Sequence, residues 1–342
     1  MDPITHVLLG ASLGYAAFGR KLGRHAALAG GLGAFVPDAD VFIHSASDPL
    51  LAIEYHRHFT HSLFFAPVGA ILCASLWMLI PRWRPHLPTL WLCCLAGYAS
   101  HCLLDSATSY GTQLLWPLTR MRVGWDWISI IDPIFTLSLL AGCCVAMIRK
   151  SPRPALLGLA LTACYMVLGN VQHERAVAAQ AALAATRQHT IERFEVMPTM
   201  ANNVVWRTLY LHDGRIYSDR VRIGWFSGAT VAEGLSLPVI EEKDLTASEK
   251  LRDQPHRPFS RFTWFSEGWV ARSPADATVI GDMRYSLSAG AFDPIWGIRF
   301  TPAGAPTDVE WINNSRNRRP AIRELWAEIR GHSPQYHPVD RR

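Results

Sequence analysis

The sequence predicts a mainly α-helical, polytopic membrane bundle followed by a β-rich α+β soluble domain. The charge distribution is the first reason: residues 1–189 contain 13 Lys/Arg and 9 Asp/Glu, whereas residues 190–342 contain 20 and 19. The second reason is that long apolar runs occur only in the first part. A length of 342 residues also favours two domains. We therefore expect a membrane domain at 1–171, a helical connector at 172–189 and a soluble domain at 190–342.

Six apolar segments in the first part are expected to form helices. They are Ile4–Phe18, Ala26–Val36, His61–Ile80, Leu90–Leu104, Ile131–Ile148 and Ala155–Val171. Only the third and the fifth approach the ~20 residues that a helix needs to cross a bilayer comfortably. The first two are short and rich in glycine, so they either pack tightly against neighbouring helices or form a re-entrant hairpin.

The loops between these segments differ in charge and predict an orientation. The loops at 19–25, 81–88 and 149–154 carry eight basic residues and no acidic residue. The N-terminus and the loops at 37–60 and 105–130 carry three basic residues and most of the acidic ones. The positive-inside rule assigns the first set to the cytoplasm. We therefore expect a multi-pass protein of a bacterial inner membrane, with the other helix ends and the C-terminal domain in the periplasm.

The C-terminal part has strand patterns, which are expected at Val204–Tyr210, Arg215–Ile223, Thr278–Leu287 and Trp296–Phe300. The sequence His212-Asp213-Gly214 predicts a hairpin turn between the first two strands. An amphipathic helix is expected at Arg319–Arg330, and the Ala-rich residues 172–189 should continue the sixth helix.

Two classes of function are disfavoured by composition. The net charge of +5 divides into +4 before residue 190 and +1 after it, so no basic stripe for nucleic acid is expected. All seven cysteines lie in apolar stretches, where cysteine behaves as a small hydrophobic residue. A disulfide framework is therefore not expected in the C-terminal domain.

Histidines and aspartates gather at alternate ends of the apolar segments. The residues at these ends are His6, Asp38, Asp40, His56, His61, His101 and Asp105. Ionisable side chains beside hydrocarbon are costly, which favours a functional site. Because imidazole and carboxylate groups are typical ligands of divalent metals, the pattern predicts a metal centre at one face of the bilayer.

The spacing His101-x-x-x-Asp105 is the sharpest local signal. Residues at i and i+4 project from one face of a helix, so these two side chains can share a metal. The alternative is a hydrogen-bonded pair at a helix end. His56 and His61 precede a long apolar segment, with Thr60 as its expected N-cap, and the alternative for them is an interfacial cluster that tolerates lipid headgroups.

The remaining candidates are weaker when taken singly. Asp38 and Asp40 cannot share a helical face, so one is expected to ligate while the other orients a histidine, unless both mark a solvated helix end. His6 alone is more typical of an interfacial side chain. For Asp132, which begins the fifth segment, a role at the site and a helix-capping role are both open.

Five motifs together carry a family resemblance. MDPITHVLLGASLG, FVPDADV, HRHFTHS, HCLLDSATSYGTQLLWPL and ISIIDP, in this order, resemble the YdjM-like family of membrane-bound metal-dependent hydrolases. The resemblance covers about residues 1–170. It implies a zinc-type hydrolase in the membrane, whose metal-centre residues would be His6, Asp38, His56, His61, His101 and Asp105. The His-x-x-x-Asp element is also distantly similar to zinc-dependent phospholipase C.

From these observations we expect a hydrolase of a lipid or lipid-linked (phospho)ester at the periplasmic face. Six ligand-capable side chains exceed the three that one catalytic zinc ion usually takes, so one or two ions are expected. Asp40 and Asp132 are the expected catalytic residues. The residues expected to bind substrate are Arg57, Thr108, Gln113 and Arg120.

Two other functions stay open, and so do any protein partners. The first is transport of a metal or solute, which is disfavoured because the ionisable residues stay at one end of the helices rather than at mid-depth. The second is a non-catalytic envelope protein in which a metal only holds helices together.

Overall fold

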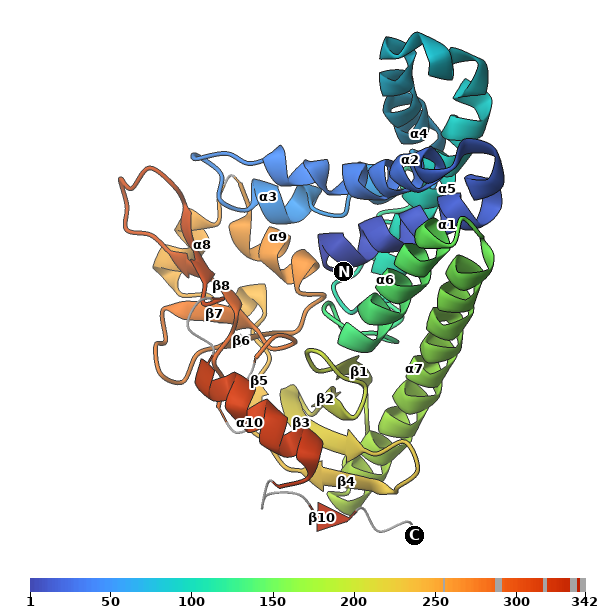
Figure 1. Cartoon of the computed structure of the whole chain (residues 1–342). Coiled ribbons are helices and arrows are strands. Elements are labelled where there is room, and N and C mark those ends of the chain that lie inside the picture. Colours follow the sequence, from blue (N-terminus) through green and yellow to red (C-terminus); the bar gives the residue numbers. More distant parts are fainter. Residues whose placement is uncertain (255, 287–290, 316–318, 333–336, 339–342) are drawn as a thin grey trace. The chain divides into compact units, whose positions relative to one another are not determined.

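The computed structural model describes residues 1–254, 256–286, 291–315, 319–332 and 337–338 (Figure 1). The chain forms two compact units, which we describe separately. Unit 1 consists of Met1–Ile43, Tyr55–Val171 and Met200–Asn202. Unit 2 consists of His44–Glu54, Gln172–Thr199 and Asn203–Arg342.

Unit 1 is helical, and helices occur in each of the predicted apolar segments. They are α1 (Pro3–Leu22), α2 (Arg24–Phe35), η1 (Val36–Phe42), η2 (Phe59–His61), α4 (Ala66–Ser75), η3 (Leu76–Leu79), η4 (Pro81–His86), α5 (Leu87–Ser106), α6 (Pro133–Ile148) and the first part of α7 (Arg153–Thr186). The elements named η are 3₁₀ helices, which are tighter than α-helices and short.

The six predicted segments contain fewer candidate membrane spans in the described part of the chain, and the expected span in the fifth segment is not among them. Among the described residues, two helical stretches are long and apolar enough to cross a membrane, namely Pro81–Ser106 and Arg153–Thr186. A third counts if the pair Leu51–His61 and Ala66–Leu79, bent by 83°, is one span. Helices α2 and α6 have 12 and 16 residues and fall short of the ~20 residues required.

The third predicted segment, His61–Ile80, is broken near its start. Helix α4 begins only at Ala66, and Pro67 occupies its first turn, where the fixed φ of proline suits a helix start. Ser62 holds the residues that follow it in a turn, since its Oγ accepts a hydrogen bond from the backbone amide of Phe64 at 3.1 Å. Thr60 is therefore not the N-cap of a long helix. It lies instead in η2 beside His61.

Glycines allow the helices at the centre of unit 1 to touch through their backbones. A Cβ atom added at Gly97 of α5 would lie 1.9 Å from the carbonyl oxygen of Gly30 in α2. One added at Gly10 of α1 would lie 2.3 Å from the same oxygen. Only residues without a side chain fit such an approach. The glycine-rich second segment is thus packed against α1 and α5, which brings the residues at the ends of these helices together.

Unit 2 contains two antiparallel sheets and short helices. The first sheet has the order β1-β2-β3-β4-β10, with β5 also paired to β3, and the second has the order β6-β7-β8-β9. Their strands are β1 (Arg193–Pro198), β2 (Val205–His212), β3 (Arg215–Ile223), β4 (Ala229–Ala232), β5 (Ser236–Pro238), β6 (Val270–Arg272), β7 (Val279–Asp282), β8 (Trp296–Phe300), β9 (Val309–Asn313) and β10 (His337–Pro338). The helices are α3 (Leu51–Tyr55, of which Tyr55 falls in unit 1), η5 (Glu242–Asp244), α8 (Ala247–Arg252), α9 (Pro258–Phe265) and α10 (Arg319–Arg330).

The β2–β3 hairpin turns as predicted. Asp213 and Gly214 have φ values of 48° and 66°, which are typical of a two-residue type I′ turn. The expected strand Thr278–Leu287 is shorter in the structure, where β7 ends at Asp282. The carboxylate of Asp282 accepts a hydrogen bond from the backbone amide of Arg284 at 2.9 Å, which turns the chain after β7. Leu287 lies outside the described residues.

Helix α7 runs without a break through the Ala-rich residues to Thr186. Within unit 2, Ala176, Ala179 and Leu183 of this helix pack against the first sheet in a core that includes Trp206 and Val221. Small side chains on α7 therefore allow it to lie close to the sheet.

Candidate metal centre

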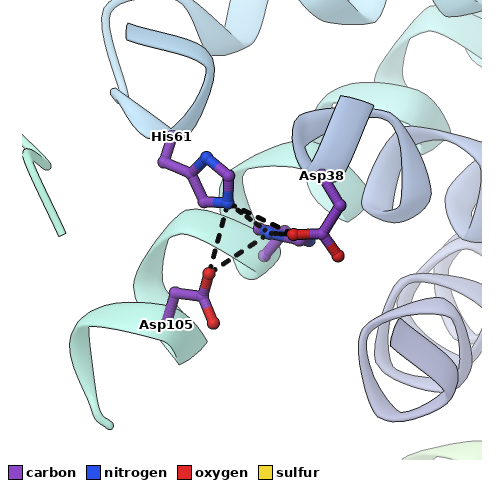
Figure 2. A group of neighbouring side chains, drawn as sticks. Asp38, His61 and Asp105 are labelled. Atoms are coloured by element: carbon purple, nitrogen blue, oxygen red, sulfur yellow. Dashed lines mark hydrogen bonds and ion pairs between the residues drawn. The ribbon is translucent and has the colours of Figure 1, made fainter. Parts of the chain in front are cut away.

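Four side chains from three elements of unit 1 converge on one point. Asp38 comes from η1, His61 from η2, and His101 and Asp105 from α5. Figure 2 shows His61, Asp38 and Asp105 pointing toward one another. One ligand atom from each of the four lies within 4.8 Å of the others. His61 and His101 are fully buried and Asp105 is 1% exposed, whereas Asp38 is 24% exposed and forms the open side.

The distances between these ligand atoms match those around one metal ion. The Nε2 atoms of His61 and His101 are 3.0 Å apart. Asp105 Oδ2 lies 3.3 Å and 3.4 Å from these two nitrogens, and Asp38 Oδ1 lies 3.5 Å and 3.6 Å from them. With metal–ligand bonds of about 2.0 Å, neighbouring ligands of a tetrahedral ion are about 3.3 Å apart. The four side chains could therefore hold one metal ion.

The second ring nitrogen of each histidine supports the same conclusion. His101 Nδ1 is 2.7 Å from the carbonyl oxygen of Ala34, and His61 Nδ1 is 3.2 Å from Asp40 Oδ2. Because both partners are acceptors, both Nδ1 atoms carry hydrogen, and in the neutral rings both Nε2 lone pairs face inward. Two lone pairs at 3.0 Å repel each other unless a proton or a cation lies between them. Metal-binding histidines use their other nitrogen in this way.

Asp105 is divided between two tasks. Its Oδ1 atom lies 3.0 Å from His6 Nε2 and 3.1 Å from an Arg57 nitrogen, and the amino group of Met1 also contacts it. Its Oδ2 atom makes no well-formed hydrogen bond within the described residues, and it faces the Nε2 atoms of His61 and His101 at 3.3 Å and 3.4 Å. A buried carboxylate oxygen without a hydrogen bond is costly, so this atom is suited to a cation.

Asp40 lies behind the cluster and connects two histidines. It is 2% exposed, and its carboxylate accepts from the Arg57 amide at 2.8 Å and lies 3.1 Å from His56 Nδ1. Burial alone would raise the pKa of Asp40, but the hydrogen bonds with His56 and His61 hold the pKa well below its usual range. Asp40 therefore stays ionised and fixes the orientation of His61.

Two of the six predicted ligands lie outside the four-atom group. His6 contacts Asp105 and stacks on His101 with ring centroids 3.6 Å apart. His56 has a side chain that is 35% exposed and is bound to Asp40. His6 therefore contacts two of the four residues, Asp105 and His101. His56 is instead bound to Asp40, which is not one of the four.

The residues predicted to be catalytic or to bind substrate differ in their contacts. Asp132 caps α6 by accepting from the amides of Ile134 and Phe135, and it also accepts from the hydroxyl of Tyr165 at 2.8 Å. Of the two roles left open for Asp132, these contacts correspond to capping.

Arg57 is buried against the site rather than free for a phosphate. Its guanidinium donates to the backbone oxygen of Asp105 at 3.2 Å and to the hydroxyl of Thr108 at 2.8 Å. Gln113 is also buried, and its backbone N–H donates to the backbone carbonyl of Arg57 at 3.0 Å. Arg120 is exposed on the loop before α6.

Two contacts at the site have little or no signal in the sequence. The Ala34 carbonyl that orients His101 is a backbone group, so no residue type marks it. The hydroxyl of Thr60 lies 3.0 Å from His61 Nδ1. Thr60 directly precedes His61 in the sequence, and this adjacency is the signal that could have predicted the contact.

Comparison with known proteins identifies relatives of the helical part. The model of the family described as YdjM inner membrane protein matches residues 1–176. Inner membrane protein YbcI of Escherichia coli (strain K12) is 34% identical over 138 residues, which are 40% of this chain and 78% of YbcI. Uncharacterized protein YfhP of Bacillus subtilis (strain 168) is 29% identical over 179 residues, 49% of this chain and about half (51%) of YfhP. No solved structure matches the chain. Since the family model covers more than half of its 342 residues, the chain belongs to the YdjM inner membrane protein family.

Proposed function

We propose that the protein is an integral-membrane metal-dependent hydrolase that acts on an ester bond of a lipid or lipid-linked substrate. The observation that carries this proposal is the convergence of two imidazole nitrogens and two carboxylate oxygens at spacings suited to one ion. Mixed nitrogen and oxygen donors in this arrangement favour zinc over magnesium or calcium, which prefer oxygen ligands alone.

A divalent ion held by Asp38, His61, His101 and Asp105 would supply an acidified water molecule and would stabilise negative charge on the ester. His6 and Arg57 would hold Asp105 in place, and Asp40 would do the same for His61. Hydrolysis adds the oxygen of water to the phosphorus or carbonyl carbon, and the ester oxygen leaves with a proton. His56 is partly exposed beside Asp40, which makes it the residue best placed to exchange that proton with solvent.

A lipid substrate is supported by exposed apolar side chains on the helix that carries Asp38. Val41 and Phe42 follow Asp38 and Asp40 in η1, and their side chains are 65% and 80% exposed. Acidic groups directed at a buried cluster, on an element whose apolar groups are exposed, suit a site at the edge of a bilayer. Arg120 remains the candidate for contact with a phosphate group.

The orientation of the site is also part of this proposal. The basic loops at 19–25, 81–88 and 149–154 lie at the helix ends that do not carry the cluster. The positive-inside rule assigns them to the cytoplasm, so we infer that the metal centre faces the periplasm.

A second candidate is a structural metal site. Four protein ligands fill a tetrahedron, and structural zinc sites are closed in this way, whereas catalytic sites keep a position for water. The exposure of Asp38 favours a catalytic site over a structural one, because one side of the centre is accessible. The two readings differ in whether the metal-loaded protein turns over a substrate.

The test uses purified full-length protein in nanodiscs, with its metal content measured before assay. Wild-type protein, His101→Ala and the matched control His44→Ala, an exposed histidine outside the cluster, are incubated with phosphodiester and carboxylic-ester lipids. The proposal expects stoichiometric zinc and hydrolysis in the wild type and in His44→Ala, and neither in His101→Ala. Full zinc loading with no hydrolysis of either lipid class would support the structural site instead.

A further inference from the structure

One loop of unit 2 exposes two aromatic side chains. Residues 224–228, Gly-Trp-Phe-Ser-Gly, connect β3 to β4. Phe226 is 101% exposed and Trp225 is 43% exposed, and no other large apolar side chain in the described part of the chain is as exposed as Phe226. Leaving such a side chain in water forgoes the free energy that its burial would contribute. An exposed pair of this kind therefore needs an explanation.

The loop is held from behind by α7, so the exposure is built into the fold. Arg175 of α7 donates to the carbonyl oxygens of Gly224 at 3.1 Å and of Ser227 at 2.5 Å. The indole nitrogen of Trp225 donates to Asn203 Oδ1 at 2.9 Å. These bonds fix the backbone and one aromatic ring, while they leave the ring of Phe226 outside.

The position of Arg175 along helix α7 indicates how far the loop lies from the apolar part of that helix. It is one of the helices long and apolar enough to cross a membrane, and its apolar part ends at Val171, which is 47% exposed. Arg175 follows four residues later on the same helix. At 1.5 Å per residue this is about 6 Å, or one turn, beyond the apolar part. Arg175 therefore holds the loop at the level where α7 leaves the apolar layer.

We propose that residues 224–228 form a membrane-interface anchor, with Trp225 and Phe226 among the lipid headgroups and the first acyl carbons. Tryptophan and other aromatic residues are enriched at this level, where one part of a ring is apolar and another finds a polar partner. The loop carries no charged side chain that would oppose insertion. Continuity with the apolar part of α7 favours lipid as the occupant over a protein partner. The anchor does not depend on the proposed hydrolase activity.

The experiment places an environment-sensitive NBD fluorophore on the loop. Phe226→Cys is labelled in full-length protein in which Cys144 and Cys164, the cysteines that are not buried, are replaced by serine. The protein is reconstituted in nanodiscs of phosphatidylethanolamine and phosphatidylglycerol, with or without brominated acyl chains. The control is Leu251→Cys on α8, where the native side chain is 75% exposed. Substitution at these two exposed sites removes little packing, so both proteins are expected to fold.

We expect blue-shifted emission at residue 226 and quenching by the brominated lipid, with water-like, unquenched emission at residue 251. Water-like emission at 226 would overturn the proposal. Blue-shifted emission that bromine does not quench would also overturn it, because it would indicate a protein partner or a second copy. Equal quenching at both positions would do the same, since the probe itself would then be responsible.

Discussion

Asp40 holds His61 from behind, with its Oδ2 atom 3.2 Å from Nδ1 of that histidine. This contact leaves Nε2 of His61 directed at His101 and Asp105. The carboxylate thus determines which nitrogen of His61 is available to a metal, although Asp40 itself contributes no atom to the four-ligand group.

Replacing Asp40 with asparagine should weaken metal binding without removing a ligand. Removal of a carboxylate behind a metal-binding histidine typically costs 10–100-fold in affinity, so we expect a loss of about that size for Asp40→Asn. Competition with a chromophoric chelator measures the affinity. Asp213→Asn, in an exposed hairpin turn that accepts asparagine, is the control and should bind as the wild type does. An unchanged affinity in Asp40→Asn would contradict the orienting role.

His56→Ala should separate metal binding from turnover. Because His56 lies outside the four-ligand group, the variant should keep the wild-type metal content. If His56 exchanges the proton, turnover should fall about 10²–10⁴-fold, which is the usual range for loss of a general acid or base. Metal analysis and a lipid hydrolysis assay on the same sample test both points. A loss of metal in this variant would contradict the prediction and would indicate that His56 is a metal ligand.

Gly97→Ala should destabilise unit 1 and disturb the site together. The added methyl group would meet the Gly30 carbonyl oxygen at 1.9 Å, and that oxygen belongs to helix backbone that cannot easily move. Overpacking of this kind costs roughly 1–3 kcal/mol. We expect a lower midpoint of thermal unfolding and reduced metal content, because Gly97 shares α5 with His101 and Asp105. Gly228→Ala, where nothing lies within 4 Å of the added atom, should leave both quantities unchanged.

The inferred orientation makes a prediction about residue 342. Alkaline phosphatase fused after Arg342 should be active, and green fluorescent protein exported by the same route should be dark, because the C-terminal domain is assigned to the periplasm. The converse pattern would place the basic loops outside and would contradict the charge argument.

The candidate site was largely predictable from the sequence because its residues follow strong local rules. The i, i+4 spacing places His101 and Asp105 on one face of α5, and the structure has both in the four-ligand group. The distinction between Asp38 and Asp40, one in the ligand group and one orienting a histidine, was also expected in kind. Which of the six predicted ligands come closest together depends on packing between helices. The sequence alone therefore does not distinguish His6 and His56 from the other four.

The parts that the sequence left unpredicted depend on breaks and turns. Pro67 and the Ser62 turn interrupt an apolar run that reads as one helix, and hydropathy alone does not reveal such a break. Asp282 ends β7 early through a bond to its own backbone neighbourhood. Arg57 was expected to face a substrate, but its guanidinium is bound to Asp105 and Thr108, a choice that only the folded structure determines.

X-ray absorption spectroscopy of the purified, zinc-loaded protein tests the metal centre most directly. We expect one ion coordinated by two imidazole nitrogens and two oxygen atoms at about 2.0 Å, and loss of one imidazole contribution in His61→Ala. Sulfur scattering at about 2.3 Å, or zinc that is absent from the wild type after exposure to stoichiometric metal, would contradict the assignment of Asp38, His61, His101 and Asp105 as the ligands.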